Sequence, residues 1–257
     1  MKKVYFVILM AGFLLVHNCP SRANILDIGR WSFDGESNPG KDDSGHGQNG
    51  TLKNGAQRVW VEQFAGALQL DGIDDYVIIP DHPSQSGMSQ LRLEAWVNPS
   101  DSAVPPPGQS YAVEVITKWG LGGVEDDSYG MYLTRTEKSD TLLVPSFWIC
   151  GGSQQTTIPL IANTPIPFNQ WTHLTAVYNG LRSYLYINKF EVAVSNISIP
   201  GLVVQDTDIP ILIGKGFYQP FAGMIDEVRI ATPEPTTLVL LSLGGLAVLR
   251  RKRSYGA

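Results

Sequence analysis

The sequence predicts an all-β protein built from antiparallel strands, and three observations lead to this fold class. Between residues 25 and 231 the apolar residues recur with a period of two, not 3.6. The apolar segments are short and bounded by clusters of Gly, Pro, Asn and Asp, which is typical of an antiparallel sandwich or barrel. No window between the two ends makes a convincing amphipathic helix. With 43% hydrophobic and 17% charged residues, the 257-residue chain can build a core, which disfavours disorder, collagen and coiled coil.

Each predicted strand is a short alternating segment that stops at turn-forming residues. The segment LRLEAWV at 91–97 places Leu, Leu, Ala and Val on one face and Arg, Glu and Trp on the other. In 183–187, Leu185 lies between two tyrosines. The other predicted strands are Leu26–Phe33, Gly66–Leu70, Tyr76–Ile79, Tyr111–Lys118, Tyr129–Arg135, Leu142–Ile149, Trp171–Tyr178, Glu191–Val194, Ile211–Ile213 and Gly223–Ile230. Two long irregular stretches, Asn98–Ser110 and Gly151–Gln170, are predicted to be surface loops.

Residues 1–23 are predicted to be a secretory signal peptide. Lys2 and Lys3 precede an apolar run, and Ser21 and Ala23 place small residues at the −3 and −1 positions of a cleavage site. The apolar run is shorter than the roughly 20 residues that span a bilayer, so an uncleaved anchor is the less favoured alternative.

Residues 232–257 have three parts in a fixed order. Pro233-Glu234-Pro235 is followed by an apolar stretch at 236–249 and then by the basic tail 250–253. This order resembles the PEP-CTERM sorting signal of Gram-negative bacteria, with its short transmembrane helix and its processing by an exosortase-type enzyme. The resemblance implies an exported protein, transiently anchored in the inner membrane and destined for the cell surface, outer membrane or extracellular matrix. A permanent tail anchor is the alternative.

The charge of the exported part differs from that of the whole chain. Removing the signal peptide and the basic tail leaves 12 basic residues against 24 acidic ones, a net charge of about −12 instead of −5. This charge disfavours nucleic acid as a partner and suits a soluble surface protein or one that collects divalent cations. Without Cys19 only Cys150 remains, so no intrachain disulfide is predicted.

Several motifs follow one another along most of the chain. They are WSFD at 31–34, DSGHGQNGT at 43–51, GALQLDG at 66–72, DDYV at 74–77, LEAWV at 93–97, WTHL at 171–174, YLYIN at 184–188 and FAGMIDEVRI at 221–230. Their order and spacing resemble the LamG-like jelly roll of the concanavalin A-like lectin/glucanase superfamily. The resemblance implies a jelly-roll β-sandwich over residues 24–231. The chain departs from the family at Asn188-Lys189, where Asp-Gly is usual, although Asn188 can still support a hairpin turn.

Catalysis is not predicted, because paired carboxylates are not recognised. Glucanases of this superfamily place two carboxyl groups on one strand face, about 5 Å apart for retaining hydrolysis. The acidic residues Glu125-Asp126-Asp127 lie in a Gly-rich turn, and Asp226 and Glu227 are adjacent and should point to opposite faces. The expected function is therefore a non-catalytic binding or structural role, with a polysaccharide or a surface protein as partner. The alternative is a glycoside hydrolase or another carbohydrate-active enzyme.

Aromatic residues beside the long loops are the candidate ligand-binding residues. Tyr111, Trp119 and Trp148 could stack on sugar rings through their apolar faces. Trp96 and Trp171 are interpreted as packing residues.

A structural calcium site is also predicted. Alternation in the closing strand places Asp226 on one face with Met224, Val228 and Ile230, so its carboxylate should point into an apolar interior. A buried carboxylate is unfavourable unless it is paired or binds a metal. The predicted ligands are Asp34, Asp42, Asp43, Asn49 and Asp226. Calcium near this loop is implied by the family resemblance; the alternative is that Asp226 accepts hydrogen bonds from backbone amides of the loop.

Overall fold

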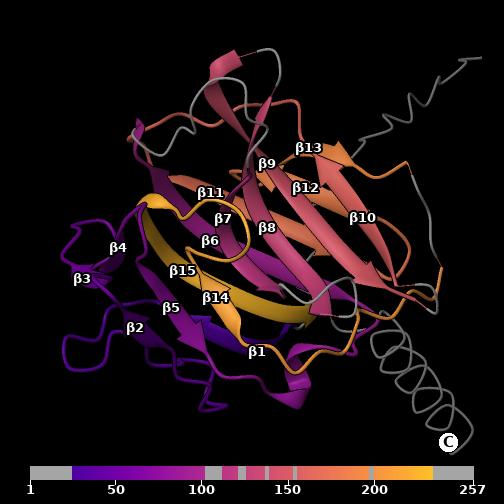
Figure 1. Cartoon of the computed structure of the whole chain (residues 1–257), viewed down its shortest axis with the longest axis horizontal. Helices are drawn as coiled ribbons and strands as arrows, with labels where there is room; N and C mark the ends of the chain where they lie inside the picture. Colours follow the sequence, from indigo (N-terminus) through magenta and orange to yellow (C-terminus); the bar gives the residue numbers. More distant parts are fainter. Residues whose placement is uncertain are drawn as a thin grey trace, which may run out of the picture. The chain divides into compact units, whose positions relative to one another are not determined.

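Two antiparallel sheets stack face to face and enclose the core (Figure 1). The computed structural model describes residues 25–101, 112–120, 126–136, 139–152, 155–196 and 200–233. The predicted signal peptide, apolar stretch 236–249 and basic tail lie outside these ranges. Within them, no helix has the length and apolar character needed to cross a membrane.

The eight-stranded sheet has the order β13-β12-β11-β6-β15-β4-β3, and β1 also pairs with β15. The closing strand β15 pairs with β6, β4 and β1, so it lies inside the sheet and not at its edge. The strands are β1 (Ile25–Trp31), β3 (Gln57–Val59), β4 (Ala67–Asp71), β6 (Leu91–Pro99), β11 (Thr172–Tyr178), β12 (Ser183–Ile187), β13 (Phe190–Val194) and β15 (Ala222–Pro233).

The seven-stranded sheet has the order β10-β9-β8-β7-β14-β5-β2. A short 3-10 helix, η1 (Pro83–Gln85), lies between β5 and β6. The strands are β2 (Thr51–Lys53), β5 (Tyr76–Ile79), β7 (Ala112–Trp119), β8 (Asp127–Thr136), β9 (Ser139–Gly151), β10 (Thr156–Ile161) and β14 (Ile211–Ile213). The all-β sandwich prediction is confirmed.

The core forms because each strand offers alternate apolar side chains to the opposite sheet. In β6 the burial alternates strictly along Leu91–Pro99, with Leu91, Leu93, Ala95 and Val97 fully buried. Trp31 is fully buried at the end of β1, and its indole Nε1 donates a hydrogen bond to the carbonyl of Gln48 at 3.0 Å. The segment 42–49 is thereby fastened to the core.

Every strand predicted from the sequence is present, with ends shifted by a few residues at most. The prediction that Gly151–Gln170 is irregular was wrong, because β10 occupies Thr156–Ile161. Pro159 takes an exposed position in the alternating burial of β10, and β10 is an edge strand, where a residue without an N–H is tolerated. The short strands β2 and β3 were also not predicted. Of the predicted loop Asn98–Ser110, residues 98 and 99 belong to β6, and residues 102–110 lie outside the described ranges.

The turn between β12 and β13 explains how the chain accommodates its departure from the family motif. Ile187 pairs with Phe190, so Asn188 and Lys189 form a two-residue hairpin loop. Their φ angles are 49° and 74°, the left-handed region that such turns require at both central positions. Asn adopts this region at a lower cost because its side chain can form local hydrogen bonds, whereas the Lys189 side chain is strained there. The Asn188 Oδ1 atom accepts the amide of His173 at 3.0 Å, which joins the turn to β11.

We therefore expect Lys189→Gly to raise the free energy of unfolding by about 0.5–1 kcal/mol, because glycine removes the left-handed strain of a side chain but adds some chain entropy. Urea denaturation measures the change. Glu191→Gly, inside β13, is the matched control and should lower stability. A Lys189→Gly protein no more stable than the parent would contradict this account of the turn.

Candidate functional site

The most distinctive cluster of side chains lies on the outer face of the seven-stranded sheet, opposite the core. Glu114 of β7 pairs in register with Tyr132 of β8. Tyr132 lies between the core residues Met131 and Leu133, and Trp148 of β9 lies between Phe147 and Ile149. Because neighbours along a strand point to opposite faces, Glu114, Tyr132 and Trp148 all face outward from three adjacent strands.

Aromatic rings surround these side chains. Trp148 packs against Trp119 at 5.9 Å, Tyr132 at 5.5 Å and Tyr218 at 5.8 Å between ring centroids. Tyr218 also contacts Tyr132, at 6.1 Å, and Phe217, at 5.1 Å. Trp119, Trp148 and Tyr218 are half-buried and Phe217 is exposed, so part of this group, here called the aromatic cluster, faces solvent. Half-exposed indole and phenol rings can stack on the apolar faces of sugars.

Polar atoms within the cluster lack partners among the described residues. Glu114 Oε2, the Tyr132 hydroxyl and Trp148 Nε1 are all buried without a hydrogen bond. Glu114 Oε1 accepts the amide of Tyr218 at 2.9 Å, which ties the segment between β14 and β15 to β7. Burial raises the pKa of Glu114 to about 7, although amide hydrogen bonds from Tyr218 and Phe217 and the charge of Lys215 lower it. Native structures leave few polar atoms unpaired in this way, and those left unpaired call for an explanation.

Two of the three predicted ligand-binding residues belong to this cluster. The structure brings Trp119 and Trp148 together, while Tyr111 lies outside the described residues. Sequence analysis missed Glu114, Tyr132 and Tyr218. The one signal for Glu114 was a lone acidic residue between two valines in a predicted strand. Tyr218 gave no signal, because only the chain reversal after β14 places it over β7.

The predicted calcium ligands make different local contacts. The Asp42 carboxylate accepts hydrogen bonds from the amides of Arg30, Ser44 and Gln48 at 2.9–3.1 Å. Burial alone would raise the pKa of Asp42, but a hydrogen bond from the Ser44 side chain, together with these amide hydrogen bonds, outweighs burial and lowers the pKa. Asn49 Oδ1 accepts the Asp42 amide at 2.9 Å. Asp42 and Asn49 therefore organise their own loop.

Asp34 and Asp43 instead line an open hollow of about 490 Å³ beside β1. The hollow also contains Glu227 and the cations Arg30 and Lys41. Asp43 accepts the Ser32 hydroxyl at 2.7 Å and pairs with Lys41 at 3.1 Å. Burial raises the pKa of Glu227, Arg30 opposes this, and Asp34 and Asp43 add to it. The hollow thus already carries charges of both signs.

Asp226 does not face the interior between the sheets, so the predicted strand face was wrong. Asp226 pairs in register with Trp96 and Arg229 with Glu94, which leaves Glu227 and Val228 opposite Ala95 alone. This β-bulge, with Glu227 at a φ of 46°, reverses the side-chain phase. Val228 and Ile230 face the core, whereas Asp226 shares the outer face with Trp96.

The Asp226 carboxyl group is nevertheless fully buried, and neither of its oxygens has a hydrogen-bond partner among the described residues. The loop amides bond Asp42, so the alternative in which they bond Asp226 was wrong. Burial raises the pKa of Asp226 to about 8; a weak contact with the Glu227 amide opposes this, and the charges of Glu227 and Asp34 reinforce it. A raised pKa favours the neutral carboxyl group at pH 7, which costs less to bury than a carboxylate.

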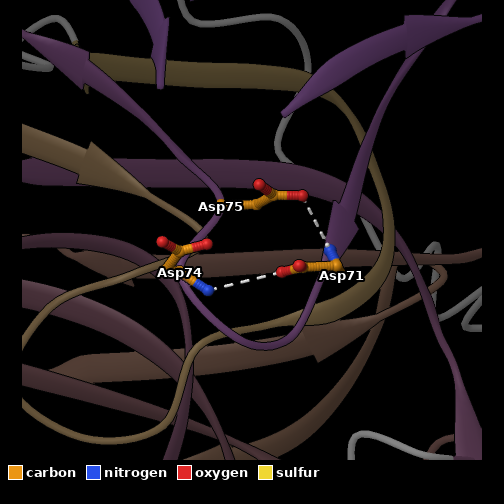
Figure 2. Close-up of side chains that lie close together, drawn as sticks. All are labelled: Asp71, Asp74 and Asp75. Carbon is orange, nitrogen blue, oxygen red and sulfur yellow. Dashed lines mark hydrogen bonds between the residues drawn. The ribbon is translucent and has the colours of Figure 1, made fainter. Parts of the chain in front are cut away.

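The aspartates at the turn between β4 and β5 form the one group of three or more possible metal ligands within the described residues (Figure 2). The ligand atoms of Asp71, Asp74 and Asp75 lie within 4.8 Å of one another. Asp71 Oδ1 accepts the amides of Ile73 and Asp74, while Asp75 accepts those of Gly55 and Asp71. Carboxylates that accept nearby backbone amides in this way are typical of Asp residues that organise a turn.

The raised pKa of Asp226 predicts a pH dependence of stability. Between the unfolded pKa near 4 and the folded pKa of about 8, the folded state binds one more proton, so the free energy of unfolding falls as pH rises. We expect Asp226→Asn to reduce this slope by up to about 1.4 kcal/mol per pH unit between pH 5 and 8. Denaturation at several pH values measures it, with Glu191→Gln, at an exposed side chain of β13, as control. An unchanged slope in Asp226→Asn would contradict the assignment.

The same variant tests calcium, which stays a prediction. A metal that binds only the folded state raises the melting temperature. At a free metal concentration one hundred times Kd, the free energy of unfolding increases by about 2.7 kcal/mol. If Asp226 is a ligand, millimolar calcium stabilises the parent protein, chelator reverses the gain, and Asp226→Asn shows neither effect. Equal melting temperatures of the parent in calcium and in chelator would exclude the predicted site.

Solved structures share this architecture. Domain 4 of AbnA, an extracellular arabinanase of Geobacillus stearothermophilus solved with arabinotriose, aligns with a TM-score of 0.57 and 21% identity, over 81% of this chain and 93% of that chain. The receptor binding domain of botulinum neurotoxin D aligns with a TM-score of 0.56 and 16% identity, over 88% of this chain and 54% of that one. The binding domain of Paraclostridial Mosquitocidal Protein 1 aligns with a TM-score of 0.58 and 19% identity, over 81% of this chain and 49% of that one. This chain thus spans about half of the two toxin chains, and all three likenesses establish the fold alone.

Family models identify both parts of the chain. No curated protein matches it. Residues 71–236 match the model of the concanavalin A-like lectin/glucanases superfamily, and residues 231–253 match the PEP-CTERM protein-sorting motif. The chain therefore belongs to the concanavalin A-like lectin/glucanases superfamily and carries a PEP-CTERM sorting motif.

Proposed function

We propose that the chain is an exported, non-catalytic carbohydrate-binding protein of the bacterial cell surface or extracellular matrix. The aromatic cluster on the seven-stranded sheet is its sugar-binding site. The observation that carries this proposal is the combination of half-exposed rings, Trp119, Trp148 and Tyr218, with unpartnered polar atoms in the same cluster. Stacking surfaces beside a few polar groups are what a sugar site requires.

Related structures support the proposal by their ligands. The AbnA domain was solved with arabinotriose, and the ligand binding domain of botulinum neurotoxin D was solved with N-acetylneuraminic acid. Fold likeness does not transfer a ligand, so the argument depends on the residues of this chain. A surface protein as partner, the other expectation from the sequence, would dock on the same exposed rings.

The sorting motif supports the proposed location. It implies export and membrane-associated processing in a Gram-negative bacterium. We infer that an exosortase-type enzyme acts near Pro233-Glu234-Pro235, after the chain has been held transiently in the inner membrane by residues 236–249. The mature protein then reaches the outer surface without its basic tail.

A glycoside hydrolase is the second candidate function, and Glu114 favours it. An acid with a pKa of about 7 among aromatic side chains resembles the environment that suits a general acid. Asp127 of β8 acts electrostatically on Tyr132 and Tyr218, as Glu114 does. Hydrolysis would also require a second carboxylate at a suitable separation from the first. Turnover of glycans that is lost in Glu114→Gln would replace the binding proposal by this one.

Removal of the stacking rings should weaken glycan binding. We expect Trp119→Ala and Trp148→Ala to reduce affinity about tenfold each, because each loses a stacking surface of roughly 1–1.5 kcal/mol. A glycan array read beside a hydrolysis assay identifies the ligand and gives the affinities. Trp60→Ala is the control, since Trp60 is 69% exposed beyond β3 of the other sheet. Equal losses at Trp60, or binding that both variants retain, would contradict the assigned site.

Processing of the tail is tested separately. We expect intact-mass measurement of the protein from its native host to show a chain that ends near Pro233-Glu234-Pro235 and lacks the four-residue basic tail 250–253. Replacement of Glu234 by Ala should leave the precursor unprocessed. Full-length chains ending at Ala257 in the mature surface fraction would favour a permanent anchor.

A further inference from the structure

The sorting motif begins inside the folded sheet. Its family match starts at residue 231, whereas β15 continues to Pro233. Residues 231–233 therefore belong both to the motif and to the strand. Pro233 opens the sequence Pro233-Glu234-Pro235 and pairs in register with Ile25, the first residue of β1. The segment that a processing enzyme has to read thus follows the sandwich without a spacer.

The last two residues of β15 are held by β1. The pairing of β15 with β6 ends at Ala231. Beyond it, Thr232 and Pro233 pair with the first two residues of β1. Proline has no backbone N–H, so Pro233 donates no hydrogen bond to the ladder. Detachment of residues 25–26, here called the strap, would therefore release the start of the sorting motif from the sheet.

The strap is the weakly anchored end of β1. Leu26 is 61% exposed, whereas Ile28 and Trp31 further along the strand belong to the core. Between them, Asp27 Oδ1 pairs with Arg229 Nε at 2.5 Å. Strand ends with few buried apolar contacts open at a much lower free energy than the whole domain. We expect the strap to detach up to this ion pair while the rest of the sheet stays folded.

The strap also lies close to a chain end. Cleavage of the predicted signal peptide after Ala23 leaves Asn24 alone before β1. Short terminal segments are poorly ordered unless the sheet holds them. Extended peptides are commonly recognised through backbone pairing with a strand of the binding protein. At Thr232 and Pro233 the strap already occupies one such pairing edge.

We propose that the strap shields the sorting motif, and that the exosortase-type enzyme acts on chains in which the strap has detached from Thr232 and Pro233. This inference rests on the tail processing proposed above and names the state of the domain that the enzyme recognises. An enzyme that binds a minor conformation works at a rate reduced by the population of that conformation. The stability of the strap therefore sets the rate at which the tail is removed.

A reversible cross-link tests the strap. Leu26 and Thr232 are direct partners in adjacent antiparallel strands, where Cα atoms lie about 4.5–5.5 Å apart, a separation that a disulfide spans. The full-length double variant Leu26→Cys/Thr232→Cys is incubated with membranes of the native host, and intact mass follows removal of the tail. We expect removal to be about tenfold slower in the oxidised protein and to return to the parent rate after reduction.

Leu26→Cys alone, with and without reductant, is the matched control and should be processed at the parent rate. Equal rates in the oxidised and reduced double variant would overturn the inference.

Displacement of the motif should have the opposite effect. A linker of about six Gly and Ser residues between Thr232 and Pro233 should raise the processing rate about threefold and restore processing in the oxidised double variant. Asp27→Asn, which removes the ion pair with Arg229, should also raise the rate. Glu191→Gly in β13 lowers stability away from β1 and should leave the rate unchanged. A linker without effect would overturn the shielding role.

The outcomes separate this inference from the processing proposal. Removal of the tail at equal rates in the parent and all variants would leave the processing proposal intact and overturn the role of the strap. Failure to remove the tail from the parent and from the linker variant would overturn both.

Discussion

The sandwich holds because each sheet presents one apolar face to the other, and the two-residue period of a strand then sends every alternate side chain outward. Outward positions on central strands do not stay exposed in this protein. Phe64 packs on Trp96 and Trp171 at 5.3 and 4.8 Å over the eight-stranded sheet, and Tyr218 packs on Tyr132 and Trp148 over the seven-stranded one. The connecting segments thereby create a second layer of burial outside the core.

Bulges decide where polar groups enter that outer layer. The register of β7 against β8 shifts between Glu114 and Ile116, so that Val115 and Ile116 are both part of the core while Glu114 faces outward. The bulge at Glu227 does the same in β15, where Asp226 is outward and Val228 inward. Each bulge lies next to a buried acid, in keeping with the way that bulges re-aim single side chains in sheets.

These bulges also explain what sequence reasoning could predict. Alternation in Leu91–Val97 and Ser183–Ile187 correctly predicted strands and faces, because those strands are regular and half-buried. The same reasoning misplaced Asp226, since nothing in the letters MIDEVRI marks the extra residue that reverses the phase. Trp119 and Trp148 were recognisable as aromatic residues beside loops. Their partners Glu114 and Tyr218 were not, because β7 and the segment after β14 meet only through long-range pairing.

The two buried acids, Asp226 and Glu114, differ in the polar atoms that surround them. Asp226 has two unpartnered oxygens, but no other unpartnered polar atom lies in its strand or in the partner strand β6 among the described residues. Protonation removes the cost of burying a charge, while the neutral carboxyl group still has no hydrogen-bond partner among the described residues. Glu114 is accompanied by an unpartnered hydroxyl and an unpartnered indole N–H on the next two strands, within half-exposed rings. Protonation of Glu114 leaves those two donors unsatisfied. Three unpartnered polar atoms on adjacent strands therefore distinguish the surroundings of Glu114 from those of Asp226.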